Sequence, residues 1–158
     1  MNEIEKLRKQ IADVLEWGEA HQTFEKAVAD FPAESRGVRP DGLPYSAWEL
    51  LEHMRIAQWD MLEFSHDPKH VSPDFPSGYW PASPAPPNAN AWDESVRQFR
   101  ADREDLRKLV LDPATDLTAA FPHGDGQTLL REVLLTADHN SHHLGQLILV
   151  RRLLGIWK

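Results

Sequence analysis

Three histidines stand where the helical pattern of the sequence calls for apolar side chains. His139 and His143 interrupt an apolar stripe near the C-terminus, and His53 follows Leu50 on a second apolar stripe. Histidines at positions i and i+4 share one helix face, about 6 Å apart at Cβ, so both can reach one ion. Two buried imidazoles side by side lose hydration unless something satisfies both of them. The spacing therefore indicates a metal site, to which His53 can add a third nitrogen.

Three protein nitrogens are the ligand number of a catalytic metal site that keeps positions open for water or substrate. Ligation by nitrogen alone suits Zn, Ni, Fe(II) and Cu about equally, so the residues do not select the ion. Candidate partners that could orient the ligand rings are Glu49, Asp60 and Asp138. The pattern alone leaves open a second interpretation, in which the three side chains are hydrogen-bonded core histidines of a plain interaction module.

The other histidines are expected near the site or at the surface. His142 adjoins His143 but points about 100° away round the helix, so we expect it to flank the site. His123, in a His-Gly-Asp-Gly loop, is a candidate for the border of a pocket at the end of the last helix. Surface positions are expected for His21, His66 and His70.

Composition excludes several other classes of site. The 158 residues include eight histidines and no cysteine, which excludes disulfides, Fe–S clusters and sulfur-ligated zinc. The formal net charge of −8 argues against a nucleic-acid binder, because phosphate recognition needs clustered Lys and Arg. Residues 1–5 show no basic flank before an apolar core, and no apolar stretch is long enough to span a membrane. We therefore expect a cytoplasmic protein with no membrane partner.

Four helical segments must position these histidines within one domain over residues 1–158. Apolar residues recur at steps of three and four over 2–30, 46–66, 90–111 and 128–154, and no segment alternates like a strand. Ser46 and Glu49 form a capping-box pattern at the start of the second segment. We predict an all-α four-helix bundle.

Between the second and third segments, residues 67–90 hold seven of the twelve prolines, which excludes a helix. Phe75, Tyr79 and Trp80 lie inside this long Pro-rich loop. Aromatic side chains in a long loop favour its packing back on the domain. Tyr79 and Trp80 are therefore candidates, with His123 and His142, for the lining of a pocket beside the metal.

Two stretches of sequence resemble a known family. Glu-Leu-Leu-Glu-His53-Met and Ala-Asp-His139-Asn-Ser-His142-His143-Leu-Gly145-Gln146-Leu are similar to the DinB/YfiT-like superfamily, as are residues 44–49, 79–81 and 122–124. The resemblance implies a four-helix bundle whose metal ligands are His53, His139 and His143. It also implies a homodimer and a metalloenzyme, since some branches of the family are transferases and isomerases that use low-molecular-weight thiols.

These observations favour a metal-dependent transferase that acts on a small molecule through a low-molecular-weight thiol. A metal-dependent hydrolase is the second expectation. The competing class is non-enzymatic, a bundle that binds metal structurally or as a stress-related sensor. Three ligands instead of four, in a core that should fold without metal, favour an open and reactive site.

Overall fold

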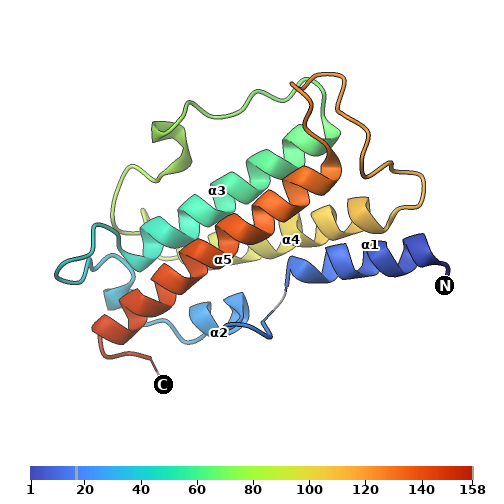
Figure 1. Cartoon of the computed structure of the whole chain (residues 1–158). Coiled ribbons are helices and arrows are strands. Elements are labelled where there is room, and N and C mark those ends of the chain that lie inside the picture. The colour runs from blue at the N-terminus through green and yellow to red at the C-terminus, as the bar shows by residue number, and fades with distance from the viewer. Residues whose placement is uncertain (17, 158) are drawn as a thin grey trace.

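The computed structural model describes residues 1–16 and 18–157, in which every regular element is a helix (Figure 1). Four main helices form the bundle: α1 (Glu3–Val14), α3 (Ala47–His66), α4 (Ala91–Leu111) and α5 (Leu129–Leu153). A short helix α2 (Phe24–Val28) and two 3₁₀ turns, η1 (Ala33–Ser35) and η2 (Ser77–Tyr79), lie in the connections. The predicted all-α bundle is confirmed.

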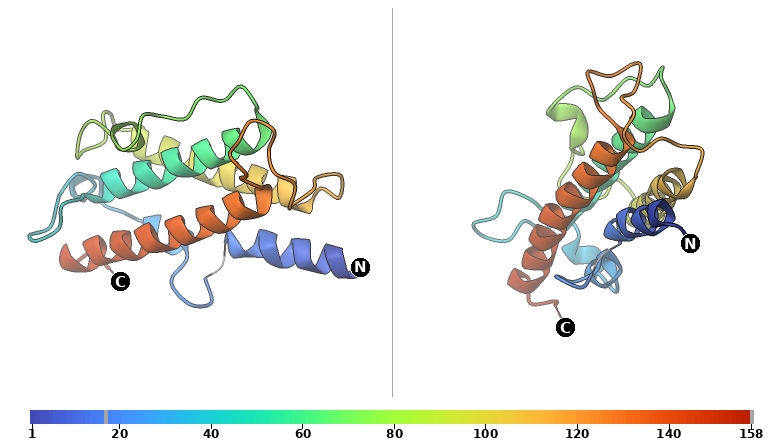
Figure 2. Two further views of the ribbon diagram at one scale, coloured as in Figure 1. Left: turned by 45° about the horizontal axis from the view of Figure 1, so that its top comes forward. Right: turned by 45° about the vertical axis from the view of Figure 1, so that its right-hand side comes forward.

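Helices α3 and α5 lie side by side along the bundle, while α4 packs against α3, and α1 packs against α4 and α5 (Figures 1 and 2). α3 contacts both α4 and α5, so two of its faces are buried. The core has two parts. One surrounds Leu51, Trp92 and Phe99, and the other surrounds Leu106 and Val133.

Helix starts follow local side-chain chemistry. The hydroxyl of Ser46 accepts from the Glu49 N–H at 3.2 Å, and the Glu49 carboxylate accepts from the Ser46 N–H at 2.8 Å. This capping box fixes the first turn of α3 where the sequence predicted it. Thr128 caps α5 in a similar way by accepting from the Arg131 N–H.

The prediction of one helix over residues 2–30 is wrong. α1 ends at Val14, and α2 begins only at Phe24, where the Thr23 hydroxyl accepts from the Lys26 N–H. After Leu15, residues 18–23 offer no large apolar side chain to hold another helical turn against the core. The prediction also covered Trp17, which lies outside the described residues.

Residues 67–90 link α3 to α4 and form no regular element except η2. The segment passes over the outer side of α3 in both figures. Its attachment to α3 includes a hydrogen bond of 2.5 Å from the Ser46 hydroxyl to the Pro84 carbonyl. No described helix is both long enough and apolar enough to cross a membrane.

Candidate metal centre

The structure brings His53 of α3 together with His139 and His143 of α5. One ring nitrogen from each residue lies within 4.8 Å of the others, an arrangement that could hold a metal ion. Nε2 of His53 is 3.1 Å from Nε2 of His143 and 3.0 Å from Nε2 of His139. His53 is only 8% exposed. The i, i+4 spacing on α5 thus places both imidazoles opposite α3.

Hydrogen bonds outside the cluster fix the proton position on two of the rings. Nδ1 of His53 is 2.7 Å from the Tyr79 carbonyl, which can only accept, so Nδ1 carries the hydrogen. Nδ1 of His143 is 2.7 Å from Oε1 of Gln146 and donates to it in the same way. In neutral rings, both Nε2 atoms therefore present lone pairs to each other.

The third ring cannot resolve this conflict. A hydrogen on Nε2 of His139 can point at only one of the two lone pairs, so the other stays unpaired. Nδ1 of His139 has no hydrogen-bond partner among the described residues. A cation at the centre of the three Nε2 atoms would satisfy all three lone pairs at once. The donor set therefore fits a divalent metal ion of borderline softness.

Protonation offers no alternative at neutral pH. Burial, reinforced by the neighbouring imidazoles, lowers the pKa of His139 to about 4. Burial also lowers the pKa of His143 to about 4 and depresses the pKa of His53. All three rings are consequently neutral at pH 7, which is the form that binds metal.

Of the four residues predicted to flank the metal site, three lie beside a ligand ring and the fourth, His123, does not. Trp80 stacks on the His53 ring, with centroids 3.9 Å apart and planes within 2°, while Tyr79 bonds to His53 only through its backbone carbonyl. His142 is exposed, and its ring centroid lies 4.9 Å from that of His143. His123 is exposed and contacts the Phe64 carbonyl at 2.8 Å, with no described contact to the three ligands.

The predicted orienting carboxylates are not where the sequence suggested. Glu49 is held by Arg39 and by its own helix cap, away from the His53 ring. Asp60 accepts hydrogen bonds from Tyr79 and His70, and none from a ligand ring. The predicted surface position of His70 is wrong, since its side chain is only 8% exposed. It is buried because it pairs with the Asp60 carboxylate.

The partners of the rings are instead a backbone carbonyl and a side-chain amide. Gln146 lies three residues after His143, on the same helix face, so spacing could have identified it. The Tyr79 carbonyl has no side-chain signature, and sequence reasoning could not find it. Asp138, the third predicted partner, is exposed.

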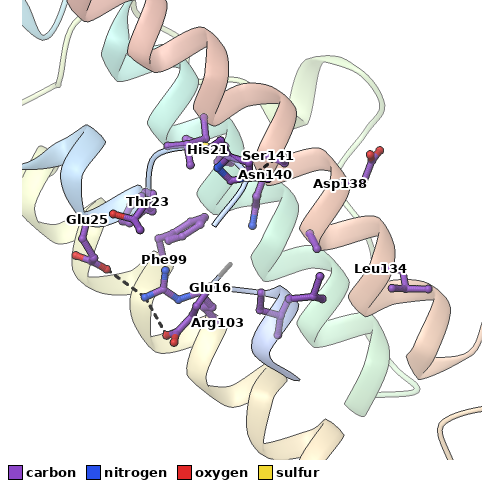
Figure 3. A pocket seen from close by; sticks show the side chains of 17 residues that line it. Glu16, His21, Thr23, Glu25, Phe99, Arg103, Leu134, Asp138, Asn140 and Ser141 are labelled. Atoms are coloured by element: carbon purple, nitrogen blue, oxygen red, sulfur yellow. Dashed lines mark hydrogen bonds and ion pairs between the residues drawn. The ribbon is translucent and has the colours of Figure 1, made fainter. Parts of the chain in front are cut away.

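A separate cavity of about 630 Å³ lies where α1 gives way to α2, against α4 and α5 (Figure 3). Its described lining is mostly apolar and includes Phe99 but none of the three clustered histidines. Arg103 lies at this cavity, with Nη2 3.1 Å from Glu25 and 3.3 Å from Glu16. Asp138 and Ser141 line it from α5.

Comparison with known proteins agrees with this architecture. A family model described as the DinB superfamily matches residues 16–147. No curated protein and no solved structure matches the chain. The family match spans most of the sequence, including α3, α4 and the part of α5 that carries His139 and His143. The chain therefore belongs to the DinB superfamily.

Proposed function

We propose that the protein binds one divalent metal ion through Nε2 of His53, His139 and His143. The observation that carries the proposal is the 3.1 Å approach of two lone-pair nitrogens, on His53 and His143, whose other ring nitrogens each donate to an oxygen. Without a cation, the two lone pairs repel each other, and because they are buried no water relieves the repulsion. Its presence between two packed helices supports an ion between the rings.

Elemental analysis of untagged protein tests the proposal. We expect about one ion per chain in the parent and its loss in His143→Ala, because two nitrogens cannot replace a three-histidine site. His142→Ala is the matched control, since it removes the adjacent, exposed imidazole. Equal metal contents in the two variants, or no metal in the parent after growth in metal-replete medium, would contradict the proposal.

We further propose that the bound metal serves catalysis and that the reaction is a group transfer with a low-molecular-weight thiol. Three protein ligands leave coordination positions for exogenous molecules. When bound, the ion would supply a Lewis acid that lowers the pKa of a coordinated thiol or water. The chain has no cysteine, so a sulfur nucleophile must come from a co-substrate. The family resemblance supports the same class of reaction.

The chain's own residues hold the ligand set. The Tyr79 carbonyl and the Gln146 amide keep the hydrogens of His53 and His143 on Nδ1, so that Nε2 is free to ligate. Trp80 covers one face of the His53 ring and excludes water from it. These contacts orient two of the three rings before any ion arrives.

A panel of thiols and small electrophiles, assayed with metal-loaded protein, tests the transferase proposal. We expect thiol-dependent turnover that is lost in His143→Ala. Turnover of esters or amides without thiol would identify a hydrolase instead. A protein that binds metal but is silent across the panel would be assigned a structural or sensing role.

A further inference from the structure

The turn that carries Tyr79 and Trp80 makes two contacts with one ligand ring. The Tyr79 carbonyl accepts from Nδ1 of His53 at 2.7 Å, and the Trp80 ring stacks on His53 at 3.9 Å. Both contacts come from η2 and its C-terminal neighbour, within the long connection between α3 and α4. The orientation of His53 therefore depends on what holds this turn against α3.

A second group of contacts holds the same turn at a point farther along α3. Asp60 accepts from the Tyr79 hydroxyl at 2.7 Å and from Nε2 of His70 at 2.7 Å. Asp60 is 9% exposed and the His70 side chain is 8% exposed. We call these three residues, Asp60, His70 and Tyr79, the Asp60 clasp.

Helix geometry explains why Tyr79 can take part in both contacts. Asp60 lies seven residues after His53, which is two turns and about 10 Å along α3. The backbone of Tyr79 therefore lies at His53, and its side chain runs along the helix to Asp60. Because a carboxylate that is taken out of water needs donors, detaching Tyr79 or His70 would leave a buried oxygen of Asp60 unpaired. The clasp thus makes release of the turn costly.

We propose that the Asp60 clasp is a positioning device for the metal centre: it holds the Tyr79 carbonyl on Nδ1 of His53 and so presents Nε2 of His53 to the ion. This inference rests on the proposed metal site but concerns residues that do not touch the ion. Partners that orient a ligand histidine commonly change metal affinity by about 10- to 100-fold when they are removed. The clasp acts one step farther out, through the carbonyl that orients the ring.

The two tyrosines of the chain provide a matched pair of variants. Tyr79→Phe removes the hydroxyl that bonds to Asp60 and leaves the backbone carbonyl in place. Tyr45→Phe removes a hydroxyl that has no hydrogen bond among the described residues, and it keeps the ring that packs on Trp80. We expect the metal dissociation constant to rise about tenfold in Tyr79→Phe and to stay unchanged in Tyr45→Phe.

A spectroscopic readout separates positioning from a general loss of stability. In long-range ¹H–¹⁵N spectra of zinc-loaded protein, His53 should be protonated at Nδ1 in the parent and in Tyr45→Phe. Its Nδ1 hydrogen should exchange faster in Tyr79→Phe, and the absorption spectrum of the Co²⁺ form should change. Asp60→Asn, which offers one acceptor oxygen instead of two, should shift the same signals in the same direction if Tyr79→Phe does not fold.

A dissociation constant and a His53 exchange rate that match the parent in both Tyr79→Phe and Asp60→Asn would overturn the inference. Failure of the metal site itself would look different, since the parent would then bind no ion. The His53 hydrogen can be followed in metal-free protein, where faster exchange in Tyr79→Phe alone would support the clasp and equal exchange in the parent and both tyrosine variants would overturn it.

Discussion

Two faces of α5, one toward α3 and one toward the cavity, place polar side chains in different electrostatic surroundings. His139 and His143 face α3, where three neutral imidazoles converge and two lone pairs oppose each other. Ser141 lies about 200° round the helix from His139 and faces the cavity of about 630 Å³. There, the charge of Arg103 is paired with Glu16 and Glu25.

The contrast shows that open volume alone does not locate a metal site. The cavity has more room than an ion requires, but two of its three carboxylates, those of Glu16 and Glu25, are paired with Arg103. The histidine cluster has little room, and its lone pairs have no internal donor that satisfies them all. The metal site is therefore identified by buried nitrogen lone pairs that only a cation can satisfy together. Variants on the two faces of α5 can test this difference between the histidine cluster and the cavity.

The largest expected effect is metal-dependent thermal stability. An ion supplied at about 100 times its dissociation constant stabilises the folded state by about 2.7 kcal/mol. For a chain of this size, that corresponds to a rise in Tm of about 5–10 °C. His139→Ala should abolish the rise in Tm. Ser141→Ala, which changes the face of the same helix that lines the cavity, should keep it. Thermal unfolding with and without Zn²⁺ measures both, and equal shifts in the two variants would contradict the comparison.

Much of the fold could be predicted because its signals are local. The capping box at Ser46 and the apolar stripes gave α3, α4 and α5 with bounds within about one residue. The break between α1 and α2 was missed because the apolar residues beyond it, such as Phe24 and Val28, continue a helical spacing. Thr23 caps a new helix there, and a cap of this kind also occurs by chance inside helical sequences.

The candidate site was predictable to the extent that it depends on helix periodicity. The spacing of His139 and His143 placed two rings on one face, and the apolar surroundings of His53 placed a third opposite them. The orienting partner of His53 is a backbone carbonyl, which any residue could supply, so its identity depends on the path of the loop. His70 was expected at the surface because its burial depends on pairing with Asp60, ten residues away on another element.

A smaller effect on stability is expected at Asp102 on α4, where one oxygen of a buried carboxylate is hydrogen-bonded and the other is not. Oδ1 of Asp102 accepts from Gln98 at 2.8 Å, while Oδ2 is buried and has no hydrogen-bond partner among the described residues. Burial raises the pKa of Asp102 above its ordinary value of 3.8. The folded state therefore binds this proton more tightly than the unfolded state, and ionisation lowers stability as the pH rises above 3.8.

Asp102→Asn should accordingly raise the free energy of unfolding at pH 7 by about 1 kcal/mol, because the amide removes a buried charge without changing shape. The advantage should shrink as the pH falls toward 3.8, where the parent carboxyl is protonated. Urea unfolding of both proteins at neutral and acid pH measures the difference. A variant that is less stable than the parent at pH 7 would show that the carboxylate is stabilised by its surroundings.

The smallest effect is expected from Arg103→Met, which removes the cation of the cavity and keeps most of the apolar stem. Glu16 and Glu25 are each 47% exposed, so solvent screens their ion pairs, and the loss should be about 0.5–1 kcal/mol in urea unfolding. Zinc affinity, measured by competition with a chelator, should not change, because the polar contacts of Arg103 among the described residues are with Glu16 and Glu25 and not with the three histidines. A clear loss of zinc affinity would mean that the cavity and the histidine cluster are coupled through α5. The claim that the two faces of α5 are electrostatically independent would then be wrong.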